Sequence, residues 1–95
     1  MIIEKTPRYN RTLKKILKAH KLTQTLIDET EAIFLENHLN PTLHYKDITC
    51  KKDKNRHSIR VVNTQYRILM SVLDDVAYFV ALLNHKDYDK NNKDC

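Results

Sequence analysis

Two arginines and a histidine in the C-terminal half carry side chains suited to phosphate chemistry. Arg60 and Arg67 flank a short polar turn, and His85 follows a long apolar run. A guanidinium stays charged and matches phosphate oxygens, and a histidine titrates near neutral pH, so it can take or give a proton. RNA cleavage by the neighbouring 2′-hydroxyl needs cations for the developing charge, a base for the hydroxyl and an acid for the leaving 5′-oxygen.

Further basic and hydroxyl groups surround these three residues in the sequence. Lys86 and Tyr88 follow His85 directly, and a basic run precedes the arginines; it consists of Lys51, Lys52, Lys54, Arg56 and His57. Such a run is often only a solvated loop. Beside an arginine pair it also suits contact with a nucleic-acid backbone, so we predict a phosphate-binding concavity with these five residues as RNA contacts.

The turn at residues 63–64 predicts that the arginines face each other. Read as a two-residue hairpin loop, it sets Arg60 opposite Arg67 and Ile59 opposite Ile68. The apolar residues then share one side of the sheet, while Ser58 and both arginines share the other. Because two like charges directly opposite destabilise a sheet, we expect an anion to offset them.

The same counting through the turn at residues 74–75 places the histidine. It pairs Leu73 with Val76 and Arg67 with Leu82, so His85 leaves the sheet just beyond Arg67. The sequence therefore predicts that the histidine and the arginine pair lie next to each other.

The elements that would position these residues form an α+β domain. Residues 1–5 predict a strand, Thr6-Pro7 starts a helix, and a second helix begins near Thr23 and ends before Asn40-Pro41. From residue 43 the apolar period changes to that of strands, over residues 43–49, 58–62, 66–72 and 76–83. We expect an N-terminal strand and a two-helix hairpin packed on an antiparallel sheet of four to five strands, with one domain over residues 1–88 and a polar, frayed tail over residues 89–95.

Composition excludes several functional classes. The 95 residues carry a formal charge of +5, and the chain has no glycine, which removes every Gly-rich phosphate loop. The longest apolar run, residues 76–83, is far shorter than the ~20 residues of a membrane span, and no signal peptide is visible, so we expect a cytoplasmic protein. Cys50 and Cys95 form no CxxC motif and are expected to be free thiols, and the histidines show no metal-binding spacing.

The order of motifs resembles the RelE/ParE superfamily of bacterial type II toxins. The resemblance runs from residue 1 to about residue 89 and is carried by three motifs that precede or follow the last strand: Ser58-Ile59-Arg60-Val61, Tyr66-Arg67-Ile68-Leu69 and Asn84-His85-Lys86-Asp87-Tyr88. It implies the microbial-ribonuclease fold and, in RelE-type members, a ribonuclease that needs no metal or cofactor and cuts mRNA in the ribosomal A site.

The resemblance also implies roles for single residues. Arg67 matches the arginine held against the scissile phosphate, Arg60 a neighbouring basic position, and His85 the general acid or base of the YafQ and YoeB branches. Lys86 and Tyr88 match assisting positions. The acidic residue of the YoeB branch falls nearest to Asp47.

The resemblance leaves more than one activity open. The leading hypothesis is a ribosome-dependent mRNA endoribonuclease whose partners are a cognate antitoxin, the 30S A site and mRNA. We expect the toxin alone to be a monomer that forms a hetero-oligomer with its antitoxin. The ParE branch instead inhibits DNA gyrase without cutting RNA, and a third alternative is an inactive remnant that only binds its antitoxin.

Overall fold

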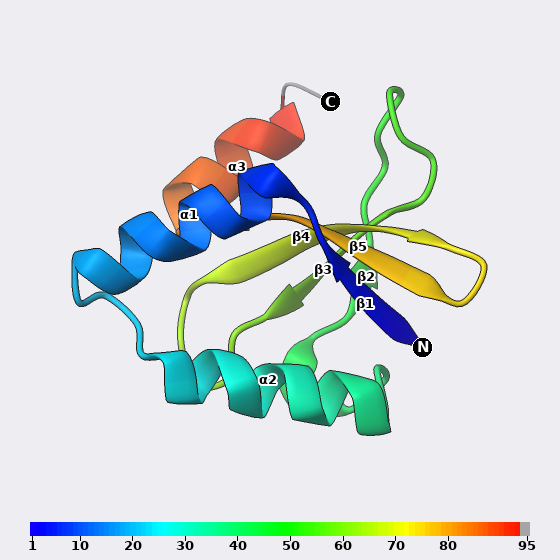
Figure 1. Cartoon of the computed structure of the whole chain (residues 1–95). Coiled ribbons are helices and arrows are strands. Elements are labelled where there is room, and N and C mark those ends of the chain that lie inside the picture. Colours follow the sequence, from blue (N-terminus) through cyan, green and yellow to red (C-terminus); the bar gives the residue numbers. More distant parts are fainter. Residues whose placement is uncertain (94–95) are drawn as a thin grey trace.

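Three helices, a short 3-10 helix and five strands make up the described residues, 1–93, of this computed structural model (Figure 1). In chain order they are β1 (Ile2–Lys5), α1 (Pro7–Lys18), α2 (Gln24–Glu36), η1 (Pro41–Leu43), β2 (Lys46–Asp47), β3 (Arg56–Arg60), β4 (Arg67–Leu73), β5 (Val76–Leu83) and α3 (His85–Lys93). This confirms the predicted α+β class with its N-terminal strand and helical hairpin.

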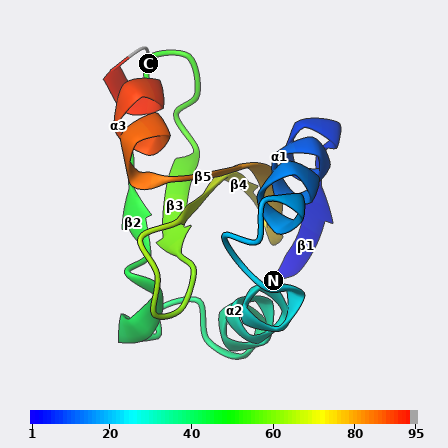
Figure 2. The same ribbon diagram turned by 90° about the vertical axis from the view of Figure 1, so that its left-hand side faces the viewer.

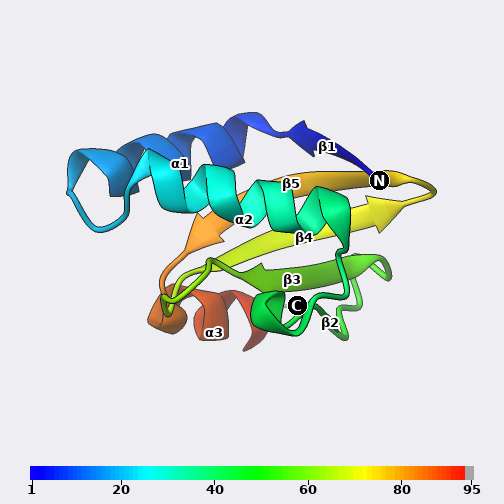
Figure 3. The same cartoon turned by 90° about the horizontal axis from the view of Figure 1, so that it is seen from below.

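The strands form one five-stranded sheet in the order β1-β5-β4-β3-β2 (Figure 3). The pairs from β2 to β5 are antiparallel, but β1 runs parallel to β5. The sheet is therefore mixed, which corrects the prediction of an antiparallel sheet. A parallel neighbour needs a long crossover connection, and here the crossover contains everything from α1 to β4.

Threonine caps start both helices of the hairpin, as the sequence predicts. The Thr6 side chain accepts a hydrogen bond from the Tyr9 backbone, with Pro7 in the first turn, and the Thr23 side chain accepts one from the Leu26 backbone. The Thr6 hydroxyl also donates to the Phe79 carbonyl at 2.9 Å. These caps satisfy helix N–H groups that have no partner within the helix, and Thr6 also fixes α1 to β5.

The main core lies between the helical hairpin and one face of the sheet. Its largest fully buried members include Tyr9 from α1, Phe34 from α2 and Phe79 from β5. Phe79 meets the other two rings edge to face, at centroid distances of 5.3 and 5.8 Å. This packing makes the hairpin and the sheet one rigid support.

Helix α3 covers the other face of the sheet. Its buried residue, Tyr88, packs in a second cluster with Leu69, Ala81 and Leu83, and Figure 2 shows α3 on the side opposite to α1 and α2. The sequence predicts a frayed tail from residue 89, but the helix continues to Lys93, and only residues 94–95 of that tail lie outside the described part. One buried aromatic residue fixes a helix that is otherwise polar.

Two strand predictions need correction. Residues 43–49 form the end of η1 and the two-residue strand β2 instead of one long strand. Between β4 and β5 a bulge at Leu69/Met70 shifts the register, so Arg67 faces Leu83 and not Leu82. A bulge adds one unpaired residue to a strand, and an apolar run such as residues 76–83 conceals it.

The turns use non-glycine residues in the left-handed region. In residues 1–93 they are His20, His44, Asn63 and Asp74, with φ between 50° and 60°. Asn, Asp and His tolerate this region better than most other side chains. The chain therefore makes its tight turns without glycine, at positions that hold polar side chains.

Two further expectations concern cysteine and the membrane. Cys50 is buried and disulfide-bonded, so the prediction of a free thiol is wrong for this residue, and Cys95 lies outside the described residues. Among the helices of residues 1–93, none has the length and apolar character that crossing a bilayer requires.

Candidate phosphate-binding site

Arg60 and Arg67 face each other across β3 and β4, as the turn at residues 63–64 predicts. The paired residues are Arg60 with Arg67 and Ile59 with Ile68. Both isoleucines are fully buried in the main core. Because side chains alternate along a strand, both arginines lie on the opposite face, the one that α3 covers.

Both guanidinium groups are partly buried and lack partners. Arg60 Nε and Arg67 Nη1 are buried nitrogens without a hydrogen-bond acceptor, and neither arginine belongs to any salt bridge in the described part of the chain. Buried donors are nearly always paired in folded proteins. Two unpaired donors on adjacent arginines therefore make this pair the candidate site for an anion.

The electrostatics of Arg67 support the same conclusion. Burial, and then the charge of Arg60, lower the pKa of the Arg67 guanidinium, while Tyr88 and Asp89 partly oppose this. A lowered pKa means that the surroundings disfavour the positive charge. A bound phosphate would reverse that balance, because an anion stabilises both charges.

Tyr88 of α3 contacts Arg67 through its ring and Ser58 through its hydroxyl. Two cations contact its ring, with Lys46 Nζ at 5.6 Å and Arg67 Cζ at 5.7 Å from the ring centroid. Its hydroxyl is 2.8 Å from the buried Ser58 hydroxyl. The Tyr88 hydroxyl is thus hydrogen-bonded to a buried side chain. Together with the ring contact, this suits a residue that positions Arg67.

Replacing Tyr88 with phenylalanine tests this support. We expect Tyr88→Phe to lower the free energy of unfolding by about 1 kcal/mol, because the buried Ser58 hydroxyl loses its partner. Thermal or urea unfolding measures the change, and Tyr78→Phe on exposed ring surface of β5 is the matched control. Equal losses in both variants would contradict a specific role for the Tyr88 hydroxyl.

The first turn of α3 carries His85, two residues beyond Leu83, the β5 residue that pairs with Arg67. The Asn84 side chain accepts a hydrogen bond from the Asp87 backbone at 2.8 Å and so begins the helix. One turn later, Asp89 Oδ2 lies 3.2 Å from His85 Nε2, and the Asp89 charge also acts on Arg67. Asp89 is a site residue that the sequence interpretation missed, because residues 89–95 were predicted to be a tail. The i, i+4 spacing from His85 was the available signal.

Comparison with known proteins finds similarity at the level of structure. No family model matches the sequence, and no curated protein matches it. YafQ from Escherichia coli BL21(DE3) superposes with a TM-score of 0.71 at 12% identity, over 90% of this chain and 94% of that one. The chain has the fold of YafQ.

Two other solved structures agree with this likeness. In the E. coli DinJ–YafQ toxin–antitoxin complex the match has a TM-score of 0.73 and 15% identity, and it covers 90% of this chain and 92% of that one. A copper-bound mutant toxin from Helicobacter pylori matches with a TM-score of 0.72 and 14% identity, over 92% and 97%. The resemblance to RelE/ParE toxins is thus confirmed for the fold.

Within this YafQ-like fold the remaining predicted residues separate into two groups. Lys86 is exposed on the first turn of α3, and Lys51, Lys52 and Lys54 are exposed on the β2–β3 loop, where nothing restricts access of a polyanion. Arg56 is instead paired with Asp53, with 3.2 Å between Arg56 Nε and Asp53 Oδ2.

His57 lies on the opposite face of the sheet from the arginine pair. It alternates with Ser58, its ring stacks on Tyr45 at 5.0 Å, and it pairs with Asp47. The structure thus brings Asp47 to His57 and away from the face of the arginine pair, whereas Asp89 pairs with His85 and acts on Arg67.

Asp53 holds the basic loop in place, and this contact depends on pH. Burial alone would raise the pKa of Asp53, but hydrogen bonds from Ser71, the Asn55 backbone and Arg56, with the charge of Arg56, lower it below its usual value. A carboxyl whose pKa is lower in the folded state stabilises the fold above its unfolded pKa, and this stability disappears as pH falls through the folded pKa.

The lowered pKa of Asp53 determines the expected result for Asp53→Asn. The variant should be less stable than the wild type at pH 7, and the difference should shrink steadily below about pH 4. Urea unfolding at several pH values measures it, with Asp75→Asn, in the exposed β4–β5 turn, as the control. A difference that stays constant down to pH 2 would contradict a contribution from the ionised carboxylate.

Proposed function

We propose that this chain is the toxin of a type II toxin–antitoxin pair and that it cleaves mRNA on the ribosome as a metal-independent endoribonuclease. The observation that carries the proposal is the pair of partly buried arginines with unpaired nitrogens, together with the His85–Asp89 pair, whose carboxylate also acts on Arg67. The fold shared with YafQ and with the DinJ–YafQ toxin–antitoxin complex supports it.

In the proposed reaction the ribose 2′-oxygen attacks the adjacent phosphorus, and the bond from phosphorus to the 5′-oxygen breaks. Arg60 and Arg67 stabilise the negative charge that develops on the phosphate oxygens. His85 transfers a proton, either from the attacking hydroxyl or to the leaving 5′-oxygen. Asp89 orients the imidazole, Lys86 adds positive charge, and Tyr88 positions Arg67.

A cognate antitoxin is the proposed protein partner. The arginine pair and the exposed lysines of the β2–β3 loop make this face positive, so an acidic segment of the antitoxin would complement it. By covering the arginines, such a segment would prevent the toxin from binding mRNA and from entering the A site of the 30S subunit.

Primer extension on ribosome-bound mRNA tests the activity. We expect wild-type protein to cut at A-site codons, and we expect no cuts without ribosomes or with purified antitoxin in excess. Intact message in the wild-type lane would refute the nuclease. A parallel gyrase supercoiling assay without ribosomes then examines the ParE-like alternative, and a protein that is silent in both assays but binds its antitoxin is the inactive remnant.

A further inference from the structure

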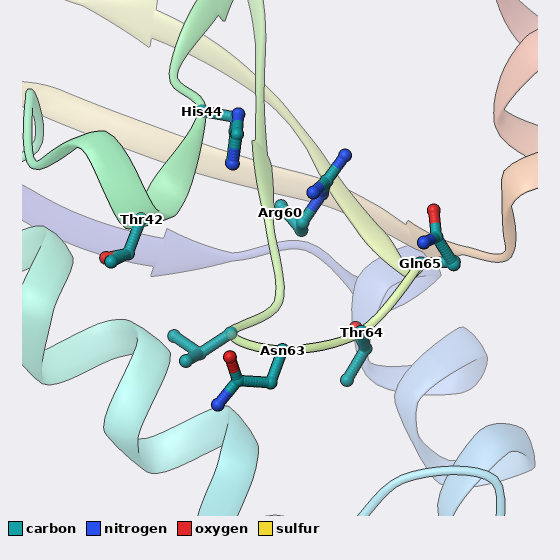
Figure 4. Close-up of a pocket in the computed structure, with 7 residues that line it drawn as sticks. Thr42, His44, Arg60, Asn63, Thr64 and Gln65 are labelled. Atoms are coloured by element: carbon teal, nitrogen blue, oxygen red, sulfur yellow. The ribbon is translucent and has the colours of Figure 1, made fainter.

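A polar hollow lies beside the arginine pair, at the end of β3. Its volume is about 300 Å³, and its polar lining consists of Thr42, His44, Arg60, Asn63, Thr64 and Gln65. Figure 4 shows Arg60 between His44, which follows η1, and Gln65, which precedes β4. Arg60 therefore belongs both to this hollow and to the pair with Arg67.

Three polar side chains in the hollow are free to bind a ligand. The two threonine hydroxyls are engaged locally, Thr42 with the Asn40 side chain and Thr64 with the Val61 carbonyl, each at 2.8 Å. In the described residues the side chains of His44, Asn63 and Gln65 have no such partners. They offer two amides and one imidazole, each with hydrogen-bond donors or acceptors.

The backbone holds these groups in fixed positions. His44 and Asn63 both lie in the left-handed region, and the hairpin turn is closed by a hydrogen bond of 3.0 Å from Thr64 N–H to the Val61 carbonyl. The neighbouring Val62 N–H donates to the buried Thr30 hydroxyl of α2 at 3.1 Å. The hollow is thus formed before any ligand binds.

From this geometry we propose that the hollow binds the base of the nucleotide whose phosphate contacts Arg60 and Arg67. The inference deepens the proposed function and rests on it for the identity of the substrate. Apart from Arg60 the lining contains no lysine, arginine or carboxylate, which suits a base edge better than a second phosphate. Amide side chains pair with base edges, a histidine ring stacks on an unpaired base, and the volume is at the small end for ligand pockets.

Cleavage by this site is therefore base-selective at the nucleotide bound in the hollow. A good bidentate contact to a base corresponds to about tenfold to hundredfold discrimination. The lysines of the β2–β3 loop contact phosphates of any sequence, so they contribute affinity without selectivity.

Nuclear magnetic resonance with nucleotides tests the hollow independently of cleavage. The full-length protein is titrated with inorganic phosphate and with the four ribonucleoside 3′-monophosphates, while side-chain signals of arginine, histidine and amides are observed. Phosphate should shift only the signals of Arg60 and Arg67. Nucleotides should also shift His44, Asn63 and Gln65, with affinities that differ at least tenfold among bases. Nucleotides that shift only the two arginines, as phosphate does, would overturn the inference.

The double variant Asn63→Gly and Gln65→Ala supplies the second measurement. Glycine keeps the left-handed turn while it removes the amide, and Asn10→Ala on the exposed side of α1 is the matched control. We expect the double variant to cut message at an altered set of bases, with discrimination reduced about tenfold, and the control to match the wild type. Active variants with unchanged preference overturn the base site alone. If wild type cuts nothing but nucleotides still shift the hollow, the proposed function fails and the base site stands.

Discussion

Arg67→Met is expected to abolish mRNA cleavage without destabilising the protein. Removing one preorganised group that stabilises a developing oxyanion lowers a rate by about a hundredfold to a thousandfold. The variant also removes a partly buried, unpaired guanidinium and its repulsion from Arg60. We therefore expect a melting temperature equal to or above that of the wild type, although the contact with the Tyr88 ring is weaker.

Inorganic phosphate separates binding from folding in this prediction. A ligand that binds only the native state raises its stability, so phosphate should raise the melting temperature of wild-type protein and have much less effect on Arg67→Met. Arg67→Lys should lie between the two, because lysine keeps the charge but not the fork. A phosphate effect of the same size in wild type and Arg67→Met would show that the anion binds elsewhere.

His85→Ala should lower the rate of cleavage by about a hundredfold to ten-thousandfold, the usual contribution of a positioned acid or base. His85 is exposed, with 60% of its side-chain surface accessible, so the fold should be unaffected. Single-turnover primer extension measures the rate, and Lys90→Ala, exposed on the same helix, controls for disturbance of α3.

Asp89→Asn belongs to the same experiment. Because Asp89 contacts His85 and not the substrate in our proposal, its replacement should cause a smaller loss of rate than His85→Ala. When both changes are combined, the loss should match that of His85→Ala alone. Additive losses would show that Asp89 acts independently of the histidine.

The register of the hairpin formed by β3 and β4 could be predicted because a single short turn connects the strands and each strand has one mainly apolar and one mainly polar face. A shift by one residue would have placed Ile59 and Ile68 on different faces of the sheet, so the apolar pattern left one choice. The observed connection between β3 and β4, residues 61–66, is longer than the predicted two residues, yet the pairs remain the same.

The features that the sequence did not reveal depend on tertiary contacts. Helix α3 is almost entirely polar, and a single residue, Tyr88, supplies the buried contact that holds it on the sheet. The i, i+4 spacing of Asp89 from His85 is visible in the sequence, but it brings the two side chains together only because this segment is a helix. The bulge in β4–β5 lies in an apolar run where both registers bury similar side chains, so no local pattern marks its position.

The parallel pairing of β1 with β5 delays completion of the fold while the protein is being synthesised. The contact from Thr6 to Phe79 joins residues 73 positions apart, and His85 and Asp89 follow later still. A ribosome makes the chain from the N-terminus, so β1 has no partner strand until nearly all of the sequence has emerged. Contacts of such long range form late and slowly. A nascent chain therefore carries both arginines of the candidate site before β1, β5 and α3 have assembled around them.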